Sequence, residues 1–142
     1  LFFGGLYTMK DLRQRAMDVL GLMNLVEDKD KLVHNYSGGM KKRLSLAIAL
    51  LHSPNTLLLD EPTVGIDPIL RRSIWEQFYK LRDAGACIII STHVMDEAAK
   101  CNRTALIHDG ALIYNDTTAN LLAKTEDGNI ESLFFSAREA RS

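Results

Sequence analysis

A short apolar run that ends abruptly in two acids constrains the fold of this chain more than any other feature. Residues 56–59 (TLLL) are apolar or β-compatible, and Asp60, Glu61 and Pro62 follow directly. Such a run is typical of a strand buried on both faces, and proline ends it because proline has no N–H to donate to a ladder. We therefore expect an α/β sheet with both acids at a strand's carboxyl end, where open α/β sheets bind ligands.

The acid pair has two interpretations when it is taken alone. Asp60 followed by Glu61 suits a carboxylate that holds a metal ion and a neighbour that activates water. The same dipeptide also suits a turn with a solvated glutamate, and for an isolated pair this second interpretation is preferred. The residues that accompany the pair shift the balance toward the first.

Composition and charge exclude several classes of protein. Of the 142 residues, 46% are hydrophobic and 25% are charged, as in an ordinary soluble domain with one core. The net charge of −1 gives no general attraction to nucleic acid, although basic residues at 41–43 and 71–72 form clusters that suit phosphates or a partner. The longest apolar stretch, residues 44–51, is far shorter than the ~20 residues that span a bilayer, so we expect no membrane crossing.

The cysteines and the first residues give two further expectations. Cys87 and Cys101 lack the spacing of metal ligands, so we expect small core residues in a reducing compartment, which favours the cytoplasm. The chain begins with Leu1 rather than Met, and no targeting sequence follows. We therefore expect a piece of a longer protein.

Two kinds of pattern divide the chain near Ser53. Before this residue, Thr8 and Asp11 have the spacing of a helix cap, and apolar residues at helical spacing predict a helix that extends to Met23. A second helix is predicted over residues 38–52. After it, short strands alternate with helices, which is typical of a mainly parallel sheet with right-handed crossovers. The predicted regions are a helical subdomain (1–53), an α/β core (54–125) and a helical tail (126–142).

Within the α/β region the spacing predicts each element in turn. Asp67 and Pro68 form a helix cap and first turn, and Gly85 is placed to end that helix. Asp109 and Gly110 suit the tight turn of an antiparallel hairpin. The predicted strands are 86–91, 104–108 and 111–114, and short helices are predicted at 94–100, at 118–123 and near residue 130.

An unusual helix start precedes the acids. Ser37 is a good N-cap residue, but Gly38 and Gly39, which follow it, weaken a helix without structural gain. Glycines there make sense if an anion must approach the bare N–H groups of the helix N-terminus, and the cations at 41–43 favour the same interpretation. A flexible turn with a solvated basic face explains the pattern about equally well.

His93 follows the predicted strand 86–91, at the edge where the two acids also lie. If the two strands are neighbours, Asp60, Glu61 and His93 come together, and the imidazole can contact a phosphate or orient water. An isolated histidine is more often a capping or core-edge residue, which is the interpretation given to the other histidines of this chain.

Taken together, these residues resemble a known family. The motifs are SGGMK at 37–41, LLLDEP at 57–62, VGID at 64–67 and STH at 91–93. In order and spacing they are similar to the nucleotide-binding domains of ATP-binding cassette (ABC) transporters, and the likeness covers nearly the whole chain. FFGGLY at 2–7 and TVGIDP at 63–68 resemble bacterial cassettes of the export type. The family likeness implies a partial P-loop NTPase fold, with a helical subdomain before a mainly parallel sheet, flanking helices and an edge hairpin.

The resemblance also implies a role for each site residue on the hydrolytic side. Asp60 would be the magnesium-associated acid of the Walker B strand. Glu61 would be the general base that polarises the attacking water, and His93 the switch histidine near the γ-phosphate.

The signature side follows in the same way. Ser37, Gly38, Gly39 and Met40 would form the signature sequence, which in this family contacts ATP held mainly by the opposite protomer. Met40 stands where many members have Gln. Asp67, in the D-loop, would link the two sites of a head-to-tail dimer.

One part of the family pattern is absent, because no G-x-x-x-x-G-K-[ST] loop occurs among the 142 residues. We therefore expect the carboxyl-terminal part of a longer domain, and an isolated form that binds ATP weakly and is inactive. The resemblance implies ATP and Mg²⁺ as ligands and two partners, a transmembrane permease and a second nucleotide-binding domain. It implies no nucleic acid and a cytoplasmic position on the inner face of the cell membrane.

Two alternatives stay open. One is a cassette ATPase without a membrane partner, acting on ribosomes or on DNA, because the catalytic motifs are shared. The other is an inert fragment that presents its signature sequence to another domain.

Overall fold

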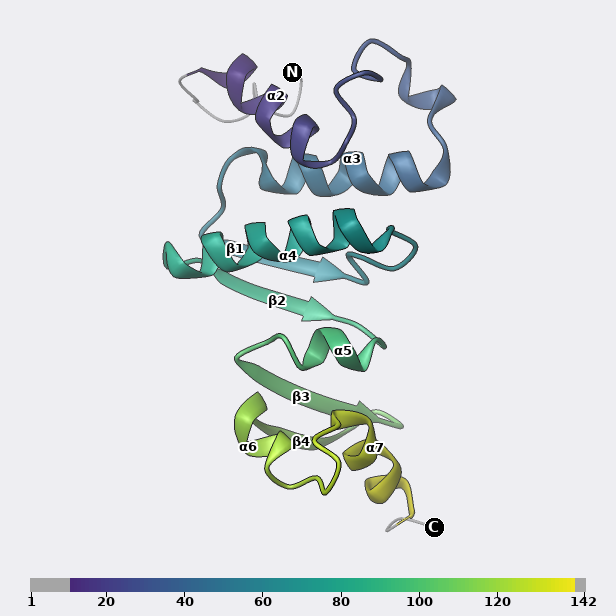
Figure 1. Ribbon diagram of the computed structural model, residues 1–142, viewed down its shortest axis with the longest axis vertical. Helices are drawn as coiled ribbons and strands as arrows, with labels where there is room; N and C mark the ends of the chain where they lie inside the picture. The colour runs from purple at the N-terminus through teal and green to yellow at the C-terminus, as the bar shows by residue number, and fades with distance from the viewer. Residues whose placement is uncertain (1–10, 140–142) are drawn as a thin grey trace. The chain divides into compact units, whose positions relative to one another are not determined.

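The computed structural model describes residues 11–139, and the chain divides into two units, Leu1–Ser91 and Thr92–Ser142 (Figure 1). Thr8, one of the two predicted cap residues of the first helix, lies outside the described residues. The predicted regional boundaries at residues 53 and 125 stay predictions.

Two helices of the first unit pack against each other in opposite directions. They are α2 (Leu12–Leu22) and α3 (Gly38–Leu51), both close to the predicted ranges. Arg15, in the first turn of α2, donates to the carbonyl oxygens of Leu50 and Leu51 at the end of α3, each at 3.2 Å. The guanidinium therefore satisfies carbonyls that a helix end leaves without intrahelical partners.

Asp11 does not have the place in the first turn of α2 that the predicted cap pair of Thr8 and Asp11 requires. Asp11 precedes α2 with a left-handed backbone (φ 56°), and its side chain makes no capping hydrogen bond. A capping residue has an extended backbone, which directs its side chain at the free N–H groups. Ser37 has that geometry before α3, with φ −64° and ψ 165°, and its side chain accepts from the backbone N of Met40.

The helix after the acids forms as predicted. In α4 (Pro68–Asp83), Asp67 caps the first turn by accepting from the backbone N of Leu70 at 2.9 Å. The apolar face of this helix is buried, and the chain leaves the helix at Gly85, where φ is 97°. The buried residues of this helix are Leu70, Ile74, Trp75, Phe78 and Leu81.

Two parallel strands lie on either side of α4 in the sequence. β1 (Thr56–Asp60) pairs with β2 (Cys87–Ser91) in a register that joins Thr56 to Cys87 and Asp60 to Ser91. The predicted order of strand, helix and parallel strand is therefore confirmed. Because the strands are parallel and in register, both carboxyl ends meet at one edge.

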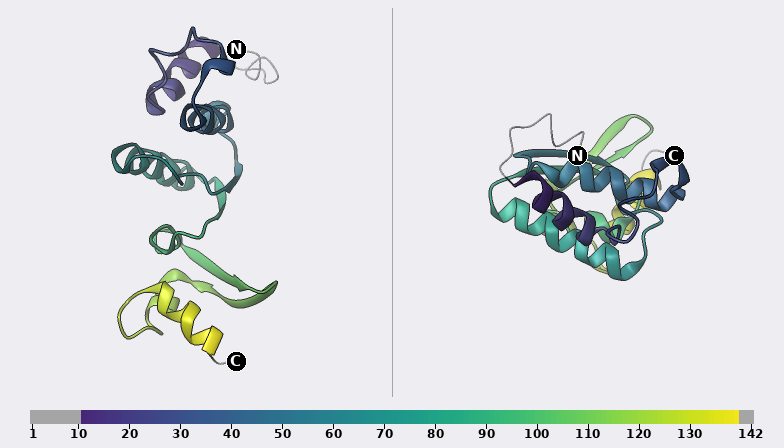
Figure 2. Two further views of the ribbon diagram at one scale, coloured as in Figure 1. Left: turned by 90° about the vertical axis from the view of Figure 1, so that its right-hand side faces the viewer. Right: turned by 90° about the horizontal axis from the view of Figure 1, so that it is seen from above.

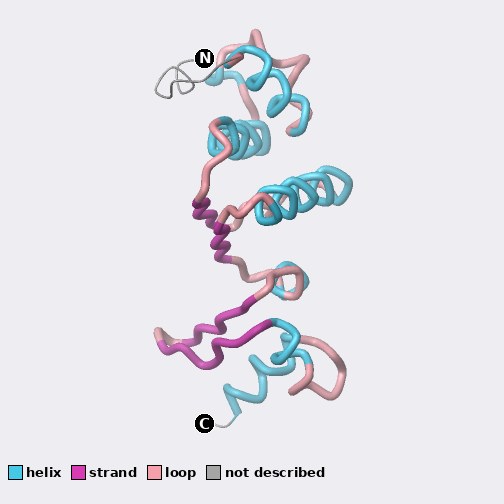
Figure 3. Tube along the Cα trace, turned by 90° about the vertical axis from the view of Figure 1, so that its left-hand side faces the viewer, coloured by secondary structure: helices cyan, strands magenta, loops and turns pink. Residues whose placement is uncertain are grey.

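The expectation that β1 is buried on both faces is wrong within the described residues. Leu57 is 5% exposed, but its neighbour Leu58 is 71% exposed, and Ile89 beside Leu58 in β2 is 56% exposed. Figures 2 and 3 show α4 on one side of the strand pair and no described helix of the first unit on the other. Cys87 shares the uncovered face and is exposed, which corrects its predicted place in the core.

The second unit is built on an antiparallel hairpin, as predicted. β3 (Arg103–His108) pairs with β4 (Ala111–Thr117) through Asp109 and Gly110, whose φ values of 49° and 72° fit the two-residue turn. The hairpin is longer than the sequence pattern indicates. The preceding helix, α5 (Met95–Ala98), is shorter than the predicted 94–100.

Two helices complete the core of the second unit. Thr117 caps α6 (Thr118–Leu122) by accepting from the backbone N of Asn120, and α7 (Ile130–Glu139) follows. The apolar core joins both helices to β3, while the hydroxyls of Thr104 and Thr118 share a buried hydrogen bond of 2.9 Å. The core residues are Leu106, Leu121, Ile130 and Leu133.

Candidate functional site

The two acids lie at the carboxyl end of β1, and β2 ends beside them. Ser91, the last residue of β2, donates its hydroxyl to the Oδ1 of Asp60 at 2.5 Å. The backbone carbonyl of Ser91 accepts from the backbone N–H of Glu61 at 2.9 Å. The predicted neighbour relation of the two strand ends is confirmed, and it brings Asp60, Glu61 and Ser91 together.

Glu61 has an uncommon backbone conformation that the sequence pattern does not predict. Its φ is 47°, in the left-handed region, and Pro62 and Thr63, which follow it, are buried. A residue before proline ordinarily favours an extended backbone. A left-handed conformation costs a residue with a side chain on the order of 1–3 kcal/mol and persists where the surroundings hold it.

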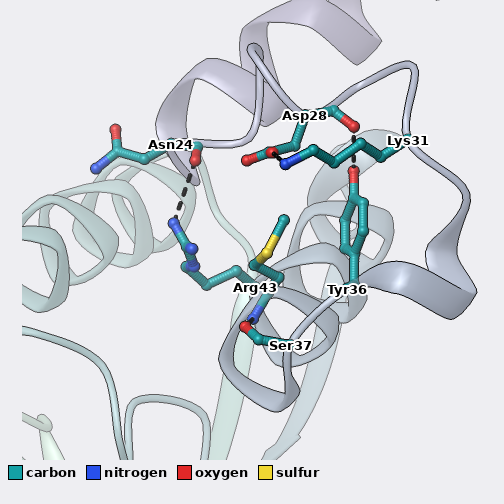
Figure 4. Close-up of polar contacts among 7 residues, drawn as sticks. Asn24, Asp28, Lys31, Tyr36, Ser37 and Arg43 are labelled. Atoms are coloured by element: carbon teal, nitrogen blue, oxygen red, sulfur yellow. Dashed lines mark hydrogen bonds and ion pairs between the residues drawn. The ribbon is translucent and has the colours of Figure 1, made fainter.

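The helix start at Ser37 is anchored by the loop before it (Figure 4). Tyr36 is buried, and its hydroxyl donates to the backbone carbonyl of Asp28 at 2.8 Å. Lys31 pairs with the carboxylate of Asp28, and this hydrogen bond raises the pKa of Lys31. Ser37 therefore begins α3 from a fixed point, while the residue itself is exposed.

Gly38 and Gly39 form the exposed first positions of α3, and no contact in the described part of the chain requires them to be glycine. A Cβ atom built on either residue meets no heavy atom within 4 Å. Each glycine weakens the helix by roughly 0.5–1 kcal/mol relative to alanine. The open space in front of this capped N-terminus fits an anion that approaches the backbone from outside the chain.

Two of the three cations that follow the glycines have internal partners. Lys42 donates to the carbonyl oxygen of Val64 at 2.8 Å. Arg43 donates to the carbonyl oxygen of Met23 at 2.9 Å and to that of Asn24 at 3.2 Å, and Figure 4 shows the second of these bonds. The cluster therefore does not act as one basic face, and Lys41 is the exposed residue among the three.

The loop between Glu61 and α4 is held by hydrogen bonds from α3 and from α4. Lys42 of α3 holds Val64, while Arg71 of α4 donates to the carbonyl oxygen of Ile66 at 3.2 Å. Gly65 lies between them with φ 77°, a conformation that glycine adopts without strain. Asp67 ends this loop, and its carboxylate caps α4.

A cavity of about 200 Å³ lies between α3 and the end of β1. Lys42 and Ser45 line it from α3, and Asp60 and Pro62 line it from the acid-bearing edge. The helix that Ser37 begins and the strand that Asp60 ends therefore border a common space within the first unit.

His93 belongs to the second unit, two residues after the end of β2, and its side chain is exposed. The residue before it, Thr92, donates its hydroxyl to the Oε2 of Glu97 at 2.9 Å and accepts from the backbone N of Val94 at 3.0 Å. Glu97 is 1% exposed, so a buried carboxylate fixes the turn that carries His93. The meeting of His93 with the two acids stays a prediction.

Comparison with known proteins decides the family. The family model described as "ABC transporter" matches residues 7–64, which contain both Ser37 and the acid pair. Among curated relatives, ABC transporter G family member 20 of Dictyostelium discoideum is 38% identical over 94% of this chain and 18% of its own length. The linearmycin resistance ATP-binding protein LnrL of Bacillus subtilis is 36% identical over 87% of this chain and 41% of its own length. The daunorubicin/doxorubicin resistance ATP-binding protein DrrA of Streptomyces peucetius is 37% identical over 81% of this chain and 35% of its own length.

The chain belongs to the ATP-binding domains of ABC transporters. It spans less than half the length of each of these three relatives. A solved structure described as an ATP binding subunit of an ABC transporter superposes with a TM-score of 0.84 at 21% identity, over 96% of this chain and 59% of the other. The α/β fold of the ABC ATPases is therefore shared.

In this ABC domain, the helices of residues 11–139 are all too short or too polar to cross a bilayer.

Sequence reasoning placed Asp60, Glu61, Ser37 and Asp67 on the correct elements and missed three further residues. These are Ser91, which holds the acids, Lys42, which holds the following loop, and Glu97, which fixes Thr92. For Ser91, the available signal was a polar residue at a strand end.

Proposed function

We propose that this chain supplies the hydrolytic residues and the signature sequence of an ATP-binding subunit that couples ATP hydrolysis to transmembrane export. The observation that carries the proposal is the acid pair at the end of β1, held by Ser91 of the parallel neighbour. The names of LnrL and DrrA, both resistance proteins, favour an exporter over a cassette ATPase without a membrane partner.

The residues at this edge fit a magnesium ion bound with a nucleotide. Mg²⁺ is commonly held by one or two carboxylates together with substrate phosphates and water, and Asp60 offers one exposed carboxylate. When bound, the ion neutralises charge on the phosphate oxygens. Asp60 is assigned to hold it, and Glu61, half-buried one residue further on, to accept a proton from the attacking water.

The signature residues are assigned to the nucleotide of a second domain. Ser37, Gly38 and Gly39, with Met40 completing the sequence, present a capped helix N-terminus to open space, which fits the phosphates of ATP held mainly by the opposite protomer. Asp67 would link the two sites, and His93 would contact the γ-phosphate.

The remaining parts of this proposal concern the intact protein. Its phosphate-binding loop would lie outside the 142 residues, within a larger and mainly parallel P-loop sheet. Two such domains would pair head to tail, bind a transmembrane permease and work at the cytoplasmic face of the membrane. The isolated chain, without that loop, would be inactive.

The test is the ATPase rate of the intact protein with Glu61→Gln. General-base catalysis contributes roughly 10²- to 10⁴-fold, so we expect the steady-state rate to fall at least about 100-fold while ATP stays bound in a dimer. The matched control is Glu76→Gln, because Glu76 is exposed on α4 and, within residues 11–139, forms its ion pair with Arg72 on the same helix. Turnover at the wild-type rate in Glu61→Gln would refute the assignment of Glu61.

A second function, presentation of the signature sequence to another domain, rests on the missing phosphate loop of the 142 residues. Adding the isolated chain to a complete ABC domain distinguishes the two roles. An increase in the partner's ATPase rate would support presentation, and an unchanged rate would exclude it.

A further inference from the structure

Ser91 is a residue of the site whose contacts the sequence pattern does not predict. It is the last residue of β2 and stands opposite Asp60 in the parallel register. Side chains alternate between the faces of a strand, so Asp60 and Ser91 lie on the uncovered face that also carries Leu58 and Ile89. The register thus places a hydroxyl donor beside one acid of the site.

Ser91 contacts both acids, each through a different group. Its hydroxyl donates to Oδ1 of Asp60 at 2.5 Å, which fixes the rotation of that carboxylate. Its backbone carbonyl accepts from the N–H of Glu61 at 2.9 Å, beyond the last paired residues of the ladder. The second contact holds the peptide of a residue whose φ is 47°.

We propose that the hydroxyl of Ser91 positions the carboxylate of Asp60, an inference that rests on the proposed role of Asp60 as the magnesium-associated carboxylate. Groups that hydrogen-bond a metal-binding carboxylate orient it, and their loss commonly weakens metal binding 10- to 100-fold. A serine suits this task because its hydroxyl is neutral. A lysine or arginine in the same place would orient the carboxylate but bring a positive charge next to a cation site.

The competing explanation is that the hydroxyl only ties the two strands together. The ladder already joins five residue pairs between β1 and β2, and the carbonyl of Ser91 adds its own bond to Glu61. Removing the hydroxyl leaves all of these backbone contacts in place. A tie of this kind therefore predicts a small loss of stability and no change in metal affinity.

Ser91→Thr and Ser91→Val form a matched pair for the test. Both side chains are β-branched and favour strands, and they differ in having a hydroxyl or a methyl group. Each is made in the intact protein carrying Glu61→Gln, so that bound ATP persists. The affinity for Mn²⁺ in the presence of ATP is measured by electron paramagnetic resonance, together with the affinity for ATP in saturating Mg²⁺ and the melting temperature.

We expect Ser91→Val to bind Mn²⁺ about tenfold more weakly than the Glu61→Gln parent and Ser91→Thr to bind within about twofold of it. ATP affinity in saturating Mg²⁺ should be equal in all three proteins. Equal Mn²⁺ affinity in the two variants would overturn the role of Ser91 and leave the proposed function intact. A parent that binds no Mn²⁺ with ATP would overturn the proposed function itself, and the role of Ser91 with it.

Discussion

Replacing Gly39 by alanine should stabilise the protein and impair it at the same time. Gly39 is the second residue of α3, its φ is not positive, and a Cβ atom there meets nothing within 4 Å. Alanine therefore enters without strain. Helix propensity then raises the free energy of unfolding by roughly 0.5–1 kcal/mol, which corresponds to about 2–4 °C in melting temperature per kcal/mol for a domain of this size class.

The same methyl group would occupy the space in which we propose that a phosphate approaches the start of α3. Displacement of a substrate by about 1 Å commonly costs on the order of 100-fold in rate. We therefore expect Gly39→Ala to lower the ATPase rate of the intact protein about 10- to 100-fold, while its melting temperature rises. A gain in stability combined with a loss of rate is the signature of a glycine kept for a ligand.

Gly21→Ala is the matched control. Gly21 lies in α2, and a Cβ atom there meets only the Cγ2 of Val26 at 3.8 Å, an ordinary contact. This variant should gain similar stability and keep its ATPase rate. The reasoning is refuted if Gly39→Ala hydrolyses ATP at the wild-type rate, or if it melts below the wild type.

Two further predictions concern the stability of each unit. Arg43→Ala removes the hydrogen bonds to the two carbonyls at the end of α2 and should lower the free energy of unfolding by about 1–2 kcal/mol in urea titration, whereas Arg13→Ala, at an exposed position of α2, should change it little. A hydrogen bond from the side chain of Asn120 is the main cause that lowers the pKa of Asp116, and a hydrogen bond from the backbone N–H of Thr117 is the second. The ionised carboxylate therefore adds stability that is present above its unfolded pKa of about 4 and is lost as the pH falls through the lower folded value, so the stability difference between wild type and Asp116→Asn should shrink below about pH 4. Equal stability of Arg43→Ala and Arg13→Ala, or a pH-independent difference for Asp116→Asn, would contradict these assignments.

Local sequence signals predicted the elements that depend on neighbouring residues. The cap of α4 by Asp67 and the apolar face that follows need only helical spacing and one short polar side chain. Asp109 and Gly110 specify the hairpin because both tolerate a positive φ. Ser37 likewise marks the first turn of α3. Each of these signals lies within about one turn of the element that it predicts.

Contacts between distant residues were not predictable in this way. Arg15 and Arg43 each satisfy the carbonyls at the end of the other helix, which depends on how α2 and α3 pack. The sequence pattern favours Lys42 as one of three cations near an anion, but its partner is a carbonyl that lies 22 residues further along the chain. The sequence pattern does not predict the exposed face of β1 at Leu58, because an apolar run does not show whether a helix packs on each face of the strand.

The backbone of Glu61 distinguishes the acid pair from the solvated turn that an Asp-Glu sequence also fits. The other residues with a side chain and positive φ in the described part of the chain are Asp11, Asn24, Ser53 and Asp109. These side chains are short and polar, and aspartate and asparagine adopt the left-handed conformation readily because they bond to the local backbone. Glutamate has no such preference, so the strain at Glu61 must be offset by its surroundings. The carbonyl of Ser91 and the buried Pro62 and Thr63 supply that support, and a solvated turn would have no reason to keep it.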